Sequence, residues 1–353
     1  MARDALRPAL LSTLAVALFA GMPTGVRAQA AAPRAAVLFS GPAMGSRYTA
    51  RVVMSPGDEA ANERIRAAID GELSRVDRLF SGWNAASEVA RLNAHASPDP
   101  FPVSAETVAA LDLGRRVSEL TGGAFDVTVA PLVDAWGFGP SRRPPEVPGP
   151  EALATLRARV GYRLLRLDPE RRTVTKGRPD VACDVSALAG GWASDRIADA
   201  IVALGHPDVL VDVGGEVTAR GRRPDGGRWR VAVEWPDRTR ERGLVIELEN
   251  AAVATSGDYR KAWTDAQGRR RSHILDPRTG EPVAHGLASA TVVHADGAWA
   301  DALATALLVL GPDEGRALAA RERLAARLVV RQADGTYAEW STPAFEALVP
   351  AAR

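Results

Sequence analysis

The sequence predicts an α+β fold, because helical and strand-like segments follow one another irregularly, without strict alternation and without a fixed repeat. Residues 60–79 carry apolar residues at helical spacing. Residues 297–311 are apolar nearly all round and predict a buried helix, whereas residues 288–295 are rich in β-branched residues and predict a strand. The chain of 353 residues, 46% hydrophobic and 25% charged, has the composition of a globular protein with a large core.

The other elements follow from the same signals. Helices are expected where a capping residue precedes a periodic segment, at 104–123 (from Ser104 to Gly122–Gly123), 150–161, 187–205 and 315–325. Strands are expected as a pair around a glycine-rich turn at 36–54, then at 125–130, 162–168, 173–186, 208–221, 229–236, 243–260 and 326–341, the last a hairpin around Asp334–Gly335. Residues 141–150 predict a surface loop.

The first thirty residues have the layout of a secretory signal peptide. Arg3 and Arg7 precede a short apolar stretch, and Ala28-Gln29-Ala30 is a small-x-small cleavage signal. The apolar stretch is short for a membrane span, although an uncleaved anchor is the alternative. Neither a lipid-attachment cysteine nor a twin-arginine pair accompanies it. We therefore predict cleavage after about Ala30, a linker at 31–36, one domain at 37–353 and a periplasmic location.

Charge and cysteine content narrow the class of protein further. The formal net charge is +1, and the first thirty residues hold three Arg and one Asp, so the remainder is near −1. Nucleic acid is therefore not expected as a partner, because binding it requires a basic surface. The only cysteine, Cys183, excludes an internal disulfide.

Common catalytic and metal-binding motifs are absent from the sequence. The five histidines form no HExxH pattern, and no CxxC pair, GxSxG elbow or Walker loop occurs. Gly214–Gly215 follow a strand, but no helix comes after them to receive a pyrophosphate, so the dinucleotide-binding signal is weak.

Asp301 and Thr305 lie four residues apart on a predicted helix and so share one face. A carboxylate on an apolar helix is costly to bury unless something pairs with it, and a hard cation such as Mg²⁺ would account for the pair. The alternative is an Asp at a helix start and a Thr bonded to its own backbone.

Three further places admit either a ligand or ordinary packing. Ser256, Gly257 and Asp258 form a tight turn that suits an anion or a ring edge, or is simply a turn. Phe125–Asp126 and Trp83 suit a planar ligand, or pack as most aromatic residues do. His273 follows a short strand and precedes the turn "DPRTG", and is a core residue, a metal ligand or a base.

Eight stretches in order resemble the ApbE family of flavin transferases, from about Met44 to Leu348. They are "AMGSRY", "DRLFSGWNAASEVARLN", "LTGGAFDVTVAPLVDAWGFG", "DVSALAGGWASDRIA", "DVGGEVTARG", "ATSGDYR", "SHILDPRTG" and "WADALATALLVLG". The resemblance implies a single ApbE-like, T-fold-related domain. It also implies an enzyme that uses Mg²⁺ to move FMN from FAD onto a Thr or Ser hydroxyl of a target flavoprotein, with release of AMP.

The resemblance also assigns residues. His273 would be catalytic, and Asp301, Thr305 and the carbonyl of Ala187 would bind Mg²⁺. The FAD site would comprise Met44, Trp83, Ala124, Phe125, Asp126, Asp184, Gly190, Ser256, Gly257, Asp258 and Ile274. A base with a pKa near that of histidine would accelerate attack by a hydroxyl about 10²- to 10⁴-fold. Asp276 either orients His273 or holds the turn.

The main departure from the family pattern is Gly190, which stands where many members have lysine. Two alternatives to transfer remain. One is hydrolysis of FAD to FMN and AMP, which some family members carry out. The other is FAD binding without catalysis, if the missing lysine silences the enzyme, although the intact His273, Asp301 and Thr305 argue against it. By family implication, an exported transferase modifies subunits of membrane redox complexes, with which it would associate peripherally.

Overall fold

The computed structural model describes residues 34–236 and 243–351, so the predicted signal peptide at 1–30 lies outside the described residues. An eight-stranded sheet forms the centre of the fold, in the order β1-β2-β6-β7-β10-β15-β16-β17. All of its neighbouring strands are antiparallel. The strands are β1 (Ala35–Ala43), β2 (Ser46–Met54), β6 (Val209–Val213), β7 (Glu216–Arg220), β10 (Ala251–Gly257), β15 (Leu287–His294), β16 (Ala325–Arg331) and β17 (Tyr337–Ser341).

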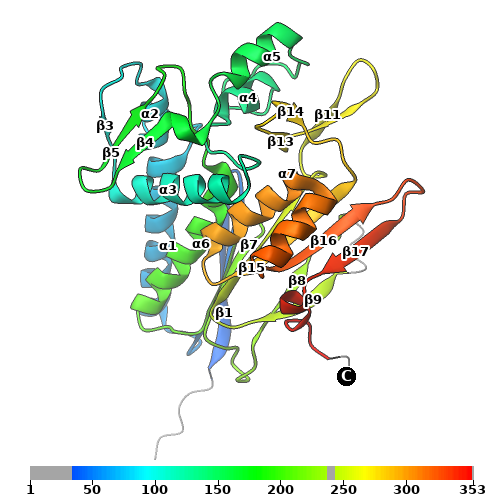
Figure 1. The fold of residues 1–353 in the computed structure, drawn as a ribbon. Coiled ribbons are helices and arrows are strands. Elements are labelled where there is room, and N and C mark those ends of the chain that lie inside the picture. The colour runs from blue at the N-terminus through cyan, green and yellow to red at the C-terminus, as the bar shows by residue number, and fades with distance from the viewer. Residues whose placement is uncertain (1–33, 237–242, 352–353) are drawn as a thin grey trace, which may run out of the picture. The chain divides into compact units, whose positions relative to one another are not determined.

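Helices cover one face of this sheet, as Figure 1 shows for α6 and α7. The main core fills the space between them and includes Ile65, Leu188, Ile197 and Leu307, each fully buried. The helices are α1 (Glu59–Phe80), α2 (Glu88–Ala94), α3 (Ala105–Leu120), α4 (Ala130–Ala135), α5 (Pro150–Arg157), α6 (Ser186–Ala203), α7 (Gly297–Arg321), α8 (Pro343–Glu346) and the 3₁₀ helix η1 (Tyr162–Leu164).

A smaller core lies on the opposite face of the sheet. There the hairpin of β8 (Trp229–Val233) and β9 (Leu244–Leu248) packs with Phe345 of α8 against strand residues such as Val53 and Leu210. Three small sheets complete the fold. They comprise β3 (Phe101–Pro102), β5 (Thr173–Lys176) and β4 (Leu165–Asp168) in that order, β11 (Ala262–Thr264) with β12 (Arg270–Ser272), and β13 (Leu275–Asp276) with β14 (Glu281–Pro282).

Most predicted elements are present, and the α+β class is confirmed. Ser104 caps α3 by accepting from the N–H of Thr107, and β16 and β17 form the hairpin expected around Asp334–Gly335. Among the described residues, no helix combines the length and the apolar character needed to span a membrane.

Two of the predicted strands are wrong. Residues 125–130 form turns and the start of α4, because the Asp126 carboxylate accepts from the N–H of Thr128 and of Tyr162 and closes the chain on itself. Residues 177–185 are not a strand, since β5 ends at Lys176. The helix expected at 315–325 is present as the second part of α7, which non-helical backbone at Gly311 separates from the first part and which ends at Arg321.

Candidate functional site

Helix α7 and strand β10 bring together residues that the sequence places far apart. The hydroxyl oxygens of Ser256 and Thr305 lie 2.9 Å apart. Asp301 precedes Thr305 by four residues on α7, so its carboxylate projects from the same face. This juxtaposition agrees with the predicted cation site.

The Asp301 carboxylate lies where α6 crosses α7. Its Oδ2 accepts from the N–H of Gly191 at 3.2 Å, and the neighbouring N–H of Gly190 also favours the charged form of this carboxyl. The two helices approach this closely because glycines meet at the crossing. A Cβ on Gly191 would lie 2.0 Å from the carbonyl oxygen of Gly297.

Burial raises the pKa of Asp301 to about 7. Its side chain is 7% exposed, and none of the described residues forms an ion pair with it. A buried carboxylate without a cation is unfavourable. The structure therefore leaves a negative charge that a bound cation would stabilise.

The predicted third ligand, the carbonyl of Ala187, also lies at this point. In an α-helix this carbonyl faces the N–H of residue 191, and that N–H donates to Asp301. The Ala187 carbonyl and the Asp301 carboxylate therefore approach the same hydrogen. Together with the Thr305 hydroxyl they form an all-oxygen donor set, which fits Mg²⁺.

This donor set differs from the usual cluster of ionisable ligands. Within the described residues, no three His, Cys, Asp or Glu side chains are grouped to hold a metal ion. Magnesium does not require such a group, because it keeps several waters and accepts phosphate oxygens. One carboxylate, one hydroxyl and one carbonyl are sufficient when the substrate carries phosphates.

Glu216 also belongs to this region, and sequence reasoning missed it. A Cβ on Gly190 would lie 2.5 Å from Glu216 Oε2, so this carboxylate occupies the space beside Gly190. Burial, and then the neighbouring Asp301, raise the pKa of Glu216 well above its usual value. The signal in the sequence was the acidic residue directly after Gly214–Gly215.

His273 follows β12 directly and is fixed through Lys261. The backbone N–H of His273 donates to the carbonyl of Lys261 at 3.1 Å, and its Nδ1 lies 3.0 Å from the same oxygen. A carbonyl only accepts, so Nδ1 carries the proton and Nε2 is left as the basic nitrogen. The ring of Phe138 lies edge-on, with ring centroids 6.2 Å apart.

The environment keeps His273 neutral. Burial lowers the pKa of His273 to about 4, and the charges of Lys261, Arg270 and Arg260 act in the same direction. A neutral imidazole with a free Nε2 can accept a proton from a hydroxyl.

Asp276 holds the turn. Its carboxylate accepts from the Arg278 guanidinium at 2.9 Å, and its carbonyl accepts from the N–H of Gly280 at 2.7 Å. The carbonyl of Lys261, rather than a carboxylate, therefore orients the imidazole.

One short segment connects the base to the cation side. Ser256 contacts Thr305, and Lys261, five residues later, binds His273. Five residues span at most about 18 Å even when fully extended. Both halves are therefore within reach of one dinucleotide.

Met44 and Trp83 are exposed, unlike most large apolar residues of the chain. Met44 is 47% exposed and has a φ of 47°, in the left-handed region that non-glycine residues seldom adopt. Trp83 is 62% exposed, with the Arg142 guanidinium 5.9 Å from its ring centroid. Exposed rings and strained backbone are frequent at binding sites.

The other predicted FAD contacts have internal partners. Ala124, Phe125, Asp126 and Ile274 are buried. Asp184 accepts from the N–H of Ser186 at the start of α6. Their assignment to the FAD site stays a prediction, and the structure shows that they also shape the backbone.

Asp258 has the most complete pairing in the predicted set. Its carboxylate accepts from the guanidinium groups of Arg270 and Arg331, each at 3.1 Å. A Cβ on the preceding Gly257 would lie 2.3 Å from the Tyr259 ring. The prediction of a tight turn at these three residues is wrong in part, because Ser256 and Gly257 pair with β15 as the last residues of β10, and the turn begins only at Asp258.

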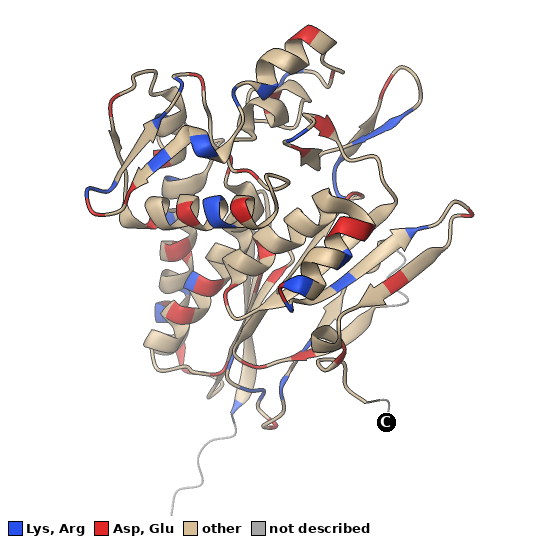
Figure 2. Cartoon of the chain, in the orientation of Figure 1, with Lys and Arg blue, Asp and Glu red and all other residues tan. Residues whose placement is uncertain are grey.

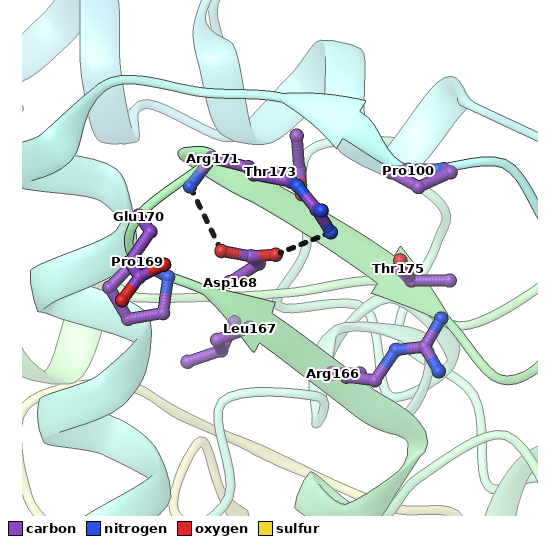
Figure 3. Close-up of a pocket in the computed structure, with 9 residues that line it drawn as sticks. All are labelled: Pro100, Arg166, Leu167, Asp168, Pro169, Glu170, Arg171, Thr173 and Thr175. Atoms are coloured by element: carbon purple, nitrogen blue, oxygen red, sulfur yellow. Dashed lines mark hydrogen bonds and ion pairs between the residues drawn. The ribbon is translucent and has the colours of Figure 1, made fainter.

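A separate hollow of about 670 Å³ lies on the β4–β5 hairpin (Figure 3). Asp168 and Arg171 form an ion pair at its rim, at 3.5 Å. None of the predicted site residues lines it, so the hollow is distinct from the site described above.

Known proteins resemble this chain in sequence and in fold. The sequence model of the ApbE family matches residues 44–328. The chain belongs to the ApbE family. The FAD:protein FMN transferase of Vibrio cholerae is 38% identical over 89% of this chain and 93% of its own length, and that of Escherichia coli K12 is 32% identical over 88% and 89%.

Solved ApbE structures confirm the ApbE-like fold. The flavin transferase ApbE from Vibrio cholerae superposes with a TM-score of 0.80 at 36% identity, covering 90% of this chain and 100% of the other. The apo form of the Pseudomonas stutzeri flavinyl transferase ApbE gives 0.82 at 38% identity, covering 91% and 98%.

Proposed function

We propose that the chain is a Mg²⁺-dependent FAD:protein FMN transferase that attaches FMN to a Thr or Ser hydroxyl of an acceptor protein and releases AMP. The observation that carries this proposal is the neutral, oriented His273. It is held by the carbonyl of Lys261, which follows Ser256 of the Ser256–Thr305–Asp301 cluster by five residues. The names of the similar proteins support it.

The residues divide the reaction between them. His273 Nε2 would accept the proton of the acceptor hydroxyl while its oxygen attacks the FMN phosphorus, and the P–O bond to the AMP phosphate breaks. Asp301, Thr305 and the Ala187 carbonyl would hold Mg²⁺. When bound, the ion would supply charge neutralisation at the phosphate oxygens.

Arg260 would contribute a further positive charge, and it was not among the predicted residues. Its guanidinium lies 3.2 Å from the position of a Cβ on Gly215, next to Glu216, and forms an ion pair with Glu234 at 2.6 Å. Its charge also lowers the pKa of His273. Arg260 therefore lies near both the carboxylate of Glu216 and the imidazole of His273.

One incubation distinguishes transfer from its alternatives. The purified chain is mixed with FAD, Mg²⁺ and a flavin-accepting domain. The acceptor is then analysed by mass spectrometry, and the small molecules by chromatography. FMN linked covalently to the acceptor, together with AMP, is the expected result. Free FMN with AMP would show hydrolysis instead, and unchanged FAD would show binding alone.

We also propose that the protein is exported and acts in the periplasm on subunits of membrane redox complexes. Residues 1–30 support this through their charged start, apolar stretch and Ala28-Gln29-Ala30. Cell fractionation and N-terminal sequencing of the purified protein test it. A mature N-terminus near Ala31 is expected, and an intact Met1 on cytoplasmic protein would contradict the proposal.

A further inference from the structure

The β11–β12 hairpin next to His273 carries more positive than negative charge. We call residues 260–271 the arginine hairpin, and Figure 2 shows blue segments along it. Six basic residues lie on it or bind next to it: Arg260, Lys261, Arg269, Arg270, Arg271 and Arg331.

Three carboxylates form ion pairs with these basic residues. Asp265 pairs with both Arg269 and Arg271. Asp258 pairs with Arg270 and Arg331, and Glu234 pairs with Arg260. In the described part of the chain, Lys261 has no ion-pair partner.

About three positive charges are therefore left over on a protein that is close to neutral. Arg260, Lys261, Arg269 and Arg270 are exposed to solvent. Such a local excess of one sign attracts a partner of the opposite charge.

The hairpin is also placed to guide the second substrate. It begins at the residues that hold His273, because the Lys261 carbonyl accepts both the N–H and the Nδ1–H of His273. Arg269 lies at the other end, about four residues along the strand, which is about 13 Å. Arg269 is therefore too far from His273 to contact the phosphates at the reacting centre. An extended protein segment whose hydroxyl lies at His273 would reach it.

We propose that the arginine hairpin is the docking surface for the acceptor protein, and that it binds an acidic segment next to the Thr or Ser that receives FMN. This inference rests on the proposed function. Long-range attraction would speed the encounter and align the segment, while His273 acts on its hydroxyl.

The test measures binding separately from catalysis. A fluorescein-labelled peptide with one Thr flanked by Asp and Glu is titrated with the wild-type protein and followed by fluorescence anisotropy. A second peptide carries Asn and Gln instead. We expect the acidic peptide to bind about tenfold more tightly at low salt, and the difference to vanish at high salt.

Two variants form a matched pair. Arg269→Glu should weaken binding of the acidic peptide about threefold to tenfold. Arg171→Glu makes the same change in charge at an exposed arginine that also pairs with an aspartate, on the β4–β5 turn at the opposite side of Figure 1. It should leave binding within about twofold of wild type. Thermal melts verify that both variants fold, and Arg269→Gln replaces Arg269→Glu if that variant does not.

Equal affinity for the two peptides, or equal loss in both variants, would overturn the proposal. AMP release from FAD without acceptor should be unchanged in Arg269→Glu, and its loss would place this arginine in the FAD site instead. Failure of the proposed function would appear separately, as an acceptor protein that carries no FMN after incubation with the wild-type protein, FAD and Mg²⁺, whether or not AMP is released.

Discussion

Asp265 and Asp301 are both buried, but the groups that surround their carboxylates differ. Asp265 in the arginine hairpin accepts from the N–H groups of Gln267 and Arg269 and pairs with Arg269 and Arg271. Burial opposes its ionisation, but these hydrogen bonds hold the pKa of Asp265 at about 2. Asp301 receives only backbone N–H groups from α6, and burial raises its pKa to about 7.

This difference in pairing distinguishes aspartates that stabilise the fold from an aspartate that belongs to the proposed binding site. A carboxylate whose partners come from the chain itself fixes the shape of a loop, as Asp265, Asp258 and Asp276 do. A carboxylate left without a cation is unfavourable in the free protein and favourable once a ligand supplies one. The following predictions test this distinction.

The largest effect is expected from the neutral base. His273→Ala should lower the rate of FMN transfer about 10²- to 10⁴-fold, because the variant lacks the proposed base for the hydroxyl proton. FAD binding, measured by flavin fluorescence, should remain. Full transfer activity in this variant would refute the assignment of His273 as the base.

The pH dependence of wild-type transfer gives a second measure of the same residue. A histidine with its ordinary pKa would lose base function below about pH 6.5. Because the pKa of His273 is lowered to about 4, the acid limb of the rate profile should lie near pH 4. A limb near 6.5 would show that the buried, oriented state is not the reactive one.

Asp301→Ala should remove Mg²⁺ stimulation and lower transfer by about 10²-fold or more, since it removes the only carboxylate of the proposed donor set. Asp265→Ala is the control from the paired class. It should lower the melting temperature of the protein while Mg²⁺ stimulation persists. An active, Mg²⁺-stimulated Asp301→Ala variant would contradict the ligand assignment.

Neighbouring glycines on α6 provide a test of the crossing that positions Asp301. Gly191→Ala should destabilise the protein by about 3 kcal/mol, because the new Cβ meets the backbone carbonyl of Gly297 at 2.0 Å. Gly190→Ala should cost about 1 kcal/mol or less, since the Glu216 carboxylate that it meets can move. Chemical denaturation measures both, and equal costs would show that the helices are not held this closely.

The last prediction concerns how the stability of the metal-free protein depends on pH. Raising the folded-state pKa of Asp301 makes the native state hold a proton more tightly, so stability falls as pH rises from about 4 to about 7. His273 acts oppositely over part of this range, because its folded-state pKa is lowered. Asp301→Asn, which cannot titrate, should therefore gain up to about 4 kcal/mol relative to wild type between pH 4 and 8, at about 1.4 kcal/mol for each unit by which the pKa is raised. A difference in stability between the two proteins that stays constant from pH 4 to 8 would contradict the raised pKa of Asp301.

Much of this arrangement could be predicted from the sequence, because its signals are local. Ser104 before a periodic segment predicts the cap of α3, and the spacing of Asp301 and Thr305 predicts their shared helix face. The motifs of the family supplied His273. Local signals were sufficient wherever a residue acts within its own element.

Partners from distant parts of the chain could not be predicted. The place of Glu216 beside Gly190 depends on a β-hairpin meeting a helix, and the Lys261 carbonyl binds His273 only because β11 pairs with β12. The sequence predicts a strand at Asp126. The N–H of Tyr162, which donates to the Asp126 carboxylate in the folded chain, comes 36 residues later and gives no local signal. Tertiary contacts decided these cases.

Direct titration with a divalent cation tests the central claim most sharply. Mn²⁺, whose bound and free forms differ in their electron paramagnetic resonance signal, is added to the wild-type, Asp301→Ala and Asp265→Ala proteins with FAD present. We expect the wild-type and Asp265→Ala proteins to bind Mn²⁺, Mg²⁺ to displace it, and the Asp301→Ala protein not to bind it. Equally tight binding by Asp301→Ala would contradict the view that the unpaired carboxylate marks the site.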